Sequence, residues 1–292
     1  MREAVILMAY GSPTNPDDIM EYLRDIYHGH EPPEYAVKEN VEKYRMAGGV
    51  SPSNRIIESV RQKLEARLAR EGDFRVMLGF KHWRPSIESA VREARDWGAG
   101  IIRAIMLFPF PSDNVEESYL EPLKASLSAV GYDGQIEFID ALDRAGDRFY
   151  DMWAEIVRPL VGGAHVLYDA HSLPLRESGE EAYVGHFRRS AERISEMLGL
   201  DRYLWGFQSI GRYGDRWLRP SVYDVTRDIR EGEKVLAVPV GFVYTHLEVL
   251  YDLDYEFGGS LVARGVRYER TPLPDDRDSF IELLRSLATG GD

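Results

Sequence analysis

The sequence predicts an α/β protein made of two similar Rossmann-like domains, each a doubly wound parallel sheet, with a cleft between them. Three observations support this prediction. Apolar runs of strand length alternate with amphipathic segments of helix length, which is typical of a parallel sheet flanked by helices. The alternation occurs twice along the chain, and the two stretches share short motifs. The length of 292 residues also suits two domains better than one.

In the first half of the chain, strands and helices are expected to alternate from the N-terminus onwards. Three apolar runs predict strands: AVILMAY (4–10), FRVMLGF (74–80) and IIRAIMLFPF (101–110). The segments 56–70 and 85–97 between them have the spacing of amphipathic helices. Pro85 suits the first turn of a helix, where its missing N–H costs no hydrogen bond.

The second half repeats this order. Its predicted strands are AHVLYDA (164–170), YLWGF (203–207) and KVLAVPVGF (234–242). Its predicted helices cover residues 181–198 and 221–230. Strands that alternate with helices in this way favour a second parallel sheet.

Shared motifs indicate an internal duplication. GFKHWRPS (79–86) and GFQSIGRYGDRWLRPS (206–221) both open with Gly-Phe and close with Arg-Pro-Ser. MAYGSP and YDAHSLP each end the first strand of a half, which places Tyr10 and His171 at corresponding edges of the two sheets. Ligands of open parallel sheets bind beyond the carboxyl ends of the strands, so a cleft site is expected there.

The predicted domains are residues 1–150 and 151–292. The segment 15–52 has no counterpart in the second half, and we expect it to form a lip over the cleft. A last amphipathic helix, within RDSFIELLRSLATG (277–290), is expected to pack back across one of the halves.

Composition excludes several classes of function. The chain has no cysteine, which excludes disulfides, thiolate zinc sites and cysteine-bound iron–sulfur clusters. Its formal net charge of −13 and its lack of a basic stripe argue against nucleic-acid partners. The apolar run 4–9 is too short to cross a bilayer and lacks the pattern of a signal peptide. We therefore expect a cytoplasmic protein, and peripheral membrane contact through an apolar lip stays open.

His171 ends an apolar strand. A histidine in this position is usually a hydrogen-bonded loop residue, but its side chain exchanges protons near neutral pH and is a common metal ligand. Glu248, Asp252 and Glu256 follow a core strand at four-residue spacing, so a helix would place all three carboxylates on one face. Such a row can carry cations or protons, and it suits a functional role better than a solvated surface. His246 would face away from Glu248 on a helix, so we expect it to be structural.

Other motifs are weaker. GGVSPSNR (48–55) could hold an anion at a helix N-terminus, with Ser51 as the cap, but it lacks the lysine and spacing of a P-loop. No G-x-G-x-x-G follows the first strand, which disfavours a dinucleotide site. No G-x-S-x-G is present, which argues against a serine nucleophile. Tyr10, Lys81 and His82 lie at or after strand ends, where packing is their commonest role.

Taken in order, MAYGSP, YRMAGGVSP, GFKHWRPSIE, AHSLP and VPVGFVYTHLEVLYDLDYE resemble the ferrochelatases, which insert iron into porphyrins at the end of haem synthesis. The resemblance covers nearly the whole chain, and AHSLP and the last block are its most specific parts. It implies the chelatase-like form of the fold predicted above. It also implies a lyase that needs no organic cofactor and takes Fe²⁺ as a substrate, with porphyrin and haem as its partners.

The resemblance assigns roles to residues already selected. His171 and Glu248 match the catalytic histidine and glutamate of the cleft, and Tyr10 matches a tyrosine on the opposite face of the porphyrin. Asp252 and Glu256 match an acidic trail where protons leave and an accessory divalent ion can bind. His171, Glu248, Asp252 and Glu256 are therefore the expected metal-binding set.

The remaining porphyrin contacts also follow from the resemblance. Ser51 matches a serine near a propionate, and Lys81 is a cleft residue. Ser172 adjoins the catalytic histidine. His28 and His30 stand in IYHGHEPP, where relatives often carry basic residues, so propionate binding is expected to differ here. We also expect Phe110 and Pro111 to alter metal delivery, because relatives carry a polar side chain nearby.

Three alternatives remain at this stage. The chain could be a chelatase for another metal and tetrapyrrole, a haem or porphyrin carrier without turnover, or a two-lobed solute-binding protein. Retention of both His171 and Glu248 argues against the carrier, and the absence of a signal peptide argues against the solute binder. The choice between coproporphyrin III and protoporphyrin IX, the oligomeric state and contacts with other haem-pathway enzymes stay open.

Overall fold

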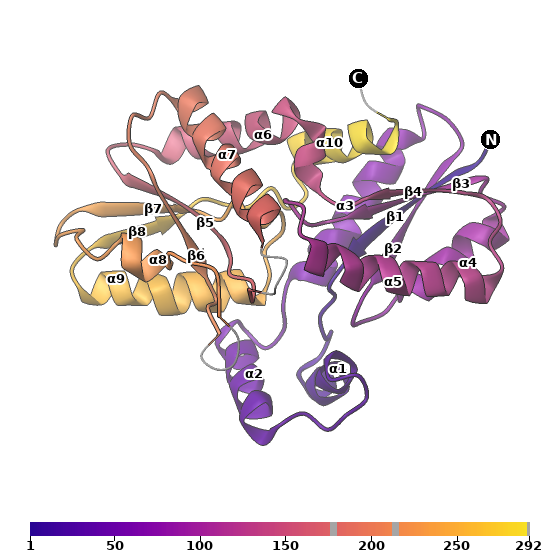
Figure 1. The fold of residues 1–292 in the computed structure, drawn as a ribbon, viewed down its shortest axis with the longest axis horizontal. Coiled ribbons are helices and arrows are strands. Elements are labelled where there is room, and N and C mark those ends of the chain that lie inside the picture. Colours follow the sequence, from indigo (N-terminus) through magenta and orange to yellow (C-terminus); the bar gives the residue numbers. More distant parts are fainter. Residues whose placement is uncertain (176–179, 212–215, 291–292) are drawn as a thin grey trace.

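The computed structural model describes residues 1–175, 180–211 and 216–290, so the last two residues of the predicted second domain lie outside the described part. Within this part, the strands form two four-stranded parallel sheets (Figure 1). The strand orders are β2-β1-β3-β4 and β6-β5-β7-β8. Matching β5 to β8 in turn with β1 to β4 gives the same order. The predicted α/β class with two doubly wound units is confirmed.

The two sheets use short strands. Those of the first are β1 (Glu3–Ala9), β2 (Phe74–Phe80), β3 (Ile101–Met106) and β4 (Gln135–Ile139). Those of the second are β5 (His165–His171), β6 (Leu204–Gln208), β7 (Lys234–Val238) and β8 (Arg267–Arg270).

Helices precede, connect and follow these strands. In the first half they are η1 (Pro16–Asp18), α1 (Ile19–Ile26), α2 (Glu34–Met46), α3 (Ser53–Leu68), α4 (Ile87–Trp97), α5 (Asp113–Val130) and η2 (Leu142–Ala145). The rest are α6 (Asp147–Val157), η3 (Arg158–Leu160), α7 (Glu181–Leu198), α8 (Val222–Val225), η4 (Val249–Gly258), α9 (Gly259–Ala263) and α10 (Asp278–Ala288).

Side chains of β1 alternate between two hydrophobic layers. Val5 and Leu7 belong to a core cluster with residues of α3 and α6, whereas Ile6 and Met8 pack with residues of α4 and α5. This alternation follows from the two-residue period of a strand. The first cluster continues through α6 and α7 into the second sheet, and Figure 1 shows α6, α7 and α10 as one layer over both sheets. The two halves therefore share a core.

A repeated connection follows β2 and β6. Its closing hydrogen bonds join Phe80 N to Pro85 O (2.7 Å) and Phe207 N to Pro220 O (2.8 Å). Ser86 and Ser221 then cap α4 and α8, because each hydroxyl accepts a hydrogen bond from the backbone amide three residues on. The shared Gly-Phe and Arg-Pro-Ser motifs thus build the same turn twice.

Three predicted elements end well before the expected residue. The strand predicted for 101–110 ends at Met106. The helix predicted for 221–230 ends at Val225, because Arg264 Nη2 donates to the carbonyls of Thr226, Arg227 and Ile229. The guanidinium thus bonds the carbonyls that the backbone amides of a further helical turn would otherwise bond. The strand predicted for 234–242 ends at Val238, because the next residue, Pro239, has no N–H to donate to a sheet.

The halves are joined by helices. The predicted boundary between residues 150 and 151 falls inside α6, so the chain leaves the first sheet in a helix, and this division of the chain stays a prediction. The C-terminal α10 lies against α3 of the first half, where ion pairs join Arg67 to Glu282 (3.0 Å) and Arg285 to Glu71 (3.2 Å). Among the described residues, no helix combines the length and apolar composition needed to cross a bilayer.

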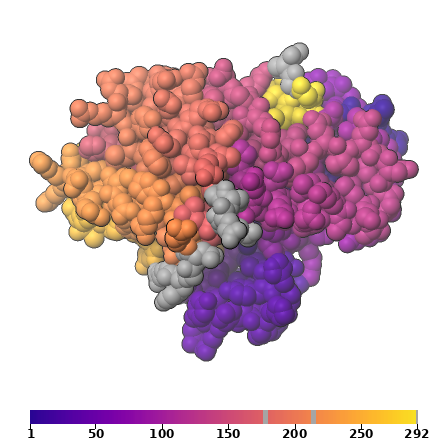
Figure 2. Space-filling view, in the orientation of Figure 1, coloured from indigo at the N-terminus to yellow at the C-terminus, as the bar shows by residue number. Residues whose placement is uncertain are grey.

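The segment 15–52, which we call the lip, contains η1, α1 and α2. Figure 2 shows it projecting from one side of the two lobes. Its own apolar cluster consists of Ile19, Tyr22, Leu23 and Tyr44. Leu247, at the start of the helix that continues as η4, packs against this cluster. The lip therefore contacts the second half at the start of that helix.

Candidate active site

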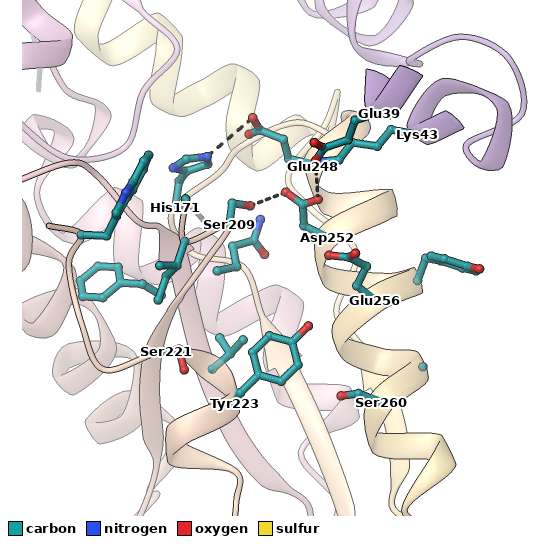
Figure 3. Close-up of a pocket in the computed structure, with 18 of the residues that line it drawn as sticks. Glu39, Lys43, His171, Ser209, Ser221, Tyr223, Glu248, Asp252, Glu256 and Ser260 are labelled. Atoms are coloured by element: carbon teal, nitrogen blue, oxygen red, sulfur yellow. Dashed lines mark hydrogen bonds and ion pairs between the residues drawn. The ribbon is translucent and has the colours of Figure 1, made fainter. Parts of the chain in front are cut away.

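A pocket of about 1070 Å³ lies at the carboxyl edge of the second sheet. Its walls are the end of β5, the chain that follows β6, the helices η4 and α9, and the lip helix α2. Figure 3 shows His171 and Glu248 facing each other at one end, with Asp252, Glu256 and Ser260 further along the helical wall. The position agrees with the rule that open parallel sheets bind ligands beyond their carboxyl edges.

His171 is held by the backbone on one side and faces a carboxylate on the other. Its Nδ1 donates to the carbonyl of Ser172, and its own carbonyl accepts from the hydroxyl of Tyr183 at 3.0 Å. A carbonyl can only accept a hydrogen bond, so Nδ1 carries a proton. The other nitrogen, Nε2, lies 3.6 Å from Glu248 Oε1. Nε2 is therefore the atom that can take up or release a proton in the pocket.

Glu248 lies between two imidazoles. His246 Nε2 is 3.3 Å from its Oε2, and His246 Nδ1 donates to the carbonyl of Tyr244 at 2.9 Å. The prediction that His246 faces away from Glu248 assumed a helix through both residues. The helix begins at Leu247 instead, so the ring of His246 turns back to the carboxylate.

Electrostatics couple the protonation of these two groups. Burial alone would lower the pKa of His171, but the neighbouring Glu248 outweighs it and raises that pKa above its ordinary value. Burial would raise the pKa of Glu248, but His171 and then His246 hold it well below the usual range. The pair is thus poised to exchange a proton when a ligand changes the local charge.

The acidic row consists of Glu248 at the N-cap of the π-helix η4 and of Asp252 and Glu256 within this helix, where an α-helix was expected. Wider turns of this type are rare and often occur at functional sites. Asp252 is buried and accepts from Ser209 Oγ at 2.5 Å, while Lys43 Nζ of the lip lies 3.0 Å from its other oxygen. Among the described residues, no three His, Asp or Glu side chains are arranged to hold a metal ion together. The acids form a row, so an ion on it would keep much of its water shell.

The first half contributes a second group of residues. The rings of Tyr10 and His82 have centroids 4.6 Å apart, and Lys81 Nζ lies 5.9 Å from the centre of the Tyr10 ring. Desolvation raises the pKa of Tyr10, and the charge of Glu248 raises it further. Tyr10 therefore lies within electrostatic reach of Glu248, although neither it nor Lys81 lines the pocket.

The other four predicted porphyrin contacts also lie away from the pocket lining. Ser172 is fully buried and its hydroxyl donates to the carbonyl of Leu218 at 3.1 Å. Ser51 is buried too, and its hydroxyl bonds that of Ser53. Residues 28 and 30, both histidines, are exposed just beyond α1. The geometry gives the hydroxyl of Ser172 a structural partner in place of the expected contact with porphyrin.

Sequence reasoning missed the wall opposite the acidic row. Gln208 lines the pocket from the end of β6, and Ser209 and Trp217 line it from the connection that follows. Glu39 and Lys43 line it from the lip. The sequence contains one indication of this wall. After the shared Gly-Phe, the second half has Gln-Ser at the place where the first half has Lys-His. Nothing local marks the lip residues, which reach the second half only through the fold.

Comparisons with known proteins give the family. The Ferrochelatase family model matches residues 2–291. The chain is 43% identical over 289 residues to a ferrochelatase of Thermoplasma acidophilum, covering 99% of this chain and 91% of that protein. It is 36% identical over 301 residues to a coproporphyrin III ferrochelatase of Geobacillus kaustophilus, covering 97% of this chain and 94% of the other.

A solved structure supports the fold. The sirohydrochlorin chelatase SirB from Bacillus subtilis subspecies spizizenii, in complex with cobalt, superposes with a TM-score of 0.61 at 11% identity. The alignment covers 99% of this chain and 97% of that one. At such low identity the structural match shows the fold alone, whereas the family model and the relatives show the family. The chain belongs to the ferrochelatase family.

Proposed function

We propose that this ferrochelatase-family enzyme inserts Fe²⁺ into a porphyrin of haem biosynthesis with His171 and Glu248 as its catalytic pair. The observation that carries the proposal is the approach of His171 Nε2 to Glu248 Oε1, 3.6 Å apart in the pocket. The imidazole is a base of suitable strength near neutral pH, and the carboxylate stabilises the imidazolium that forms.

The chemistry explains why such a pair is useful. A free porphyrin carries two N–H protons, and both must leave as Fe²⁺ enters, so the products are the neutral iron porphyrin and two protons. A flat ring shields its nitrogen lone pairs. A site complementary to a bent ring therefore gains rate by differential binding, and a base that faces the nitrogens adds about 10²–10⁴-fold.

The acidic row can accept the protons that leave the porphyrin and can bind arriving cations. Asp252 and Glu256 follow Glu248 along η4 and line the same pocket. Carboxylate oxygens suit hydrated divalent cations, and we assign to the row both proton release and the binding of an accessory divalent ion. Fe²⁺ itself is a substrate, and no organic cofactor takes part in the proposal.

The porphyrin contacts are assigned more broadly. Tyr10 and Lys81 are proposed to meet the ring from the first half, because Tyr10 lies within electrostatic reach of Glu248. Contacts of His28, His30 and Ser51 with propionates stay predictions. So do cytoplasmic location, peripheral membrane contact and association with haem-pathway enzymes.

Metal insertion can be tested directly. The protein is incubated without oxygen with Fe²⁺, or with Zn²⁺ as a stable substitute, and with coproporphyrin III or protoporphyrin IX in parallel. Coproporphyrin III comes first, because the relative from Geobacillus kaustophilus is named for it. The expected result is conversion of the free-base absorption spectrum to that of the metalloporphyrin. Porphyrin binding without conversion would contradict the proposal and indicate a carrier.

A further inference from the structure

The ammonium group of Lys43 occupies a cation position on the acidic row. Its Nζ lies 3.0 Å from Asp252 Oδ1 and 3.5 Å from Glu39 Oε1, and it sits 5.2 Å from the centre of the Tyr251 ring. The pair is largely shielded, because the side chains of Lys43 and Asp252 are 21% and 9% exposed. Such shielding makes an ion pair stronger than the usual surface pair.

The surroundings hold polar groups that Lys43 does not satisfy. Gln208 lines the same pocket and is 2% exposed, yet neither its amide oxygen nor its amide nitrogen has a hydrogen-bond partner in the described structure. The adjacent Ser209 donates to the second oxygen of Asp252. Buried polar groups are normally paired with protein or water. An unpaired amide beside the row therefore indicates a site for a hydrated ligand.

Lys43 also ties the lip to the second half. It comes from α2 of the lip, whereas Asp252 belongs to η4, and Figure 3 shows the two side chains meeting across the pocket. Among the described residues, this is the one ion pair between those two helices. The state of Asp252 is therefore linked to the position of α2.

We infer that Lys43 is a displaceable internal cation: a divalent ion that binds Asp252 replaces the Lys43 ammonium and loosens α2 from η4. This inference rests on the proposed role of the acidic row in binding divalent ions. It predicts an order of events in the reaction, because Asp252 can bind either a metal ion or Lys43 of the lip, and not both at once. Arrival of the metal then opens the lip side of the pocket, through which a tetrapyrrole can enter or leave.

Charge balance makes this exchange feasible. A divalent ion brings two positive charges to a carboxylate that now faces one, so Asp252 gains attraction when it exchanges partners. The displaced ammonium keeps a partner, because Glu39 lies four residues before Lys43 on the same helix. Neither partner of the original pair is left buried and uncompensated, which would otherwise be costly.

The test uses the full-length protein and Co²⁺ alone, without porphyrin. Affinity is measured by titration calorimetry, and the exposure of residues 34–46 by amide hydrogen exchange, with β1 as an internal reference. In the unaltered protein, Co²⁺ is expected to speed exchange in α2. In Lys43→Met, exchange is already fast, and Co²⁺ binds about tenfold more tightly because its competitor is gone.

Matched variants separate the alternatives. Lys38→Met removes a lysine from the same helix that pairs with Glu34 at the surface, and it should behave as the unaltered protein. Asp252→Asn should abolish the Co²⁺ effect on α2, whereas His171→Ala should keep it, which places the effect on the row. Unchanged exchange in α2 on Co²⁺ binding, or equal Co²⁺ affinities of the two lysine variants, would overturn the inference. Because no porphyrin is present, failure of iron insertion would leave this result unaffected.

Discussion

The connections after β2 and β6 begin and end alike but differ in what lies between. In the first half, residues 81–84 close the turn between Phe80 and Pro85. In the second half the corresponding hydrogen bond joins Phe207 to Pro220, and this longer segment brings Gln208, at the end of β6, together with Ser209 and Trp217 to the pocket. Two similar scaffolds thus differ at this point, because the second half has a binding wall where the first half has a short turn.

The strand ends show the same contrast. Tyr10 follows β1 and packs against His82 with its ring tilted, whereas His171 ends β5 and faces Glu248. Because β1 and β5 hold the same place in their sheets, the difference in chemistry comes from side chains at one edge and not from topology. Function in this molecule is therefore a property of the edge residues.

The largest expected effect separates the two strand ends. His171→Ala removes the proposed base, so the rate of iron insertion should fall by about 10²–10⁴-fold, with porphyrin binding largely kept. Tyr10→Phe at the corresponding edge removes one hydroxyl and should cost less than about tenfold. Insertion rates and porphyrin fluorescence quenching measure both. Undiminished turnover of His171→Ala would remove His171 from the mechanism and end the contrast.

The next effect lies within the second half. Glu248→Gln should slow metalation on the order of a hundredfold, because it removes the carboxylate that stabilises the imidazolium. Asp252→Asn should slow it less, since Asp252 lies one step outward and does not face His171. Single-turnover rates at saturating porphyrin compare the two variants. A slower rate in Asp252→Asn than in Glu248→Gln would contradict this assignment and would make Asp252 the main acid–base group.

Two histidines offer a third comparison. Glu248 raises the pKa of His171, whereas burial lowers the pKa of His82 despite its hydrogen bond to Asp25. His171 should therefore stay protonated to higher pH than His82, and iron insertion should rise with pH as His171 loses its proton. Proton NMR titration of the imidazoles measures both midpoints in the porphyrin-free protein. Glu248→Gln leaves burial as the main influence and should move the His171 midpoint to lower pH, and an unmoved midpoint would contradict this assignment.

The smallest effect concerns the repeated serine caps. Ser86→Ala and Ser221→Ala each remove a side-chain acceptor at a helix start, so each should lower the free energy of unfolding by about 1 kcal/mol. Only Ser221 lines the pocket, so only its replacement should also change insertion kinetics. Urea unfolding and insertion assays on both variants measure this difference. Equal loss of activity in the two would mean that the first half takes a larger part in the site.

Much of the fold could be read from the sequence. The strand predicted at 74–80 and the helix predicted at 181–198 match β2 and α7 in their bounds, because apolar periodicity is strong where both faces are covered. The edge strands β4 (QIEFI) and β8 (RYER) were not predicted. Edge position alone does not explain this, because β2 and β6 are edge strands as well. Most residues of β2 are buried, whereas most residues of β4 and β8 are exposed or half-buried, so these two strands need few apolar residues and leave a weak pattern.

The site was partly readable for a similar reason. His171 and the acidic row lie beside strong core strands, and the four-residue spacing of the acids holds on the π-helix as it would on an α-helix. Lys43 could not be found this way, because 209 positions separate it from its partner Asp252. Local patterns carry no record of such pairings, and only the packing of the lip brings the two together.

The shared core limits which parts of the molecule can move. Apolar side chains run without a break from β1 through α6 and α7 to β5, so a hinge between the halves would have to separate packed layers. The lip, by contrast, is held by a small cluster that includes Tyr44 and Leu247, by the Lys43–Asp252 ion pair and by the hydrogen bond between Asp25 and His82. We therefore expect a broad, rigid macrocycle to be admitted by local movement of the lip, and mutations that stiffen the lip should slow substrate exchange more than they slow the bond-making step.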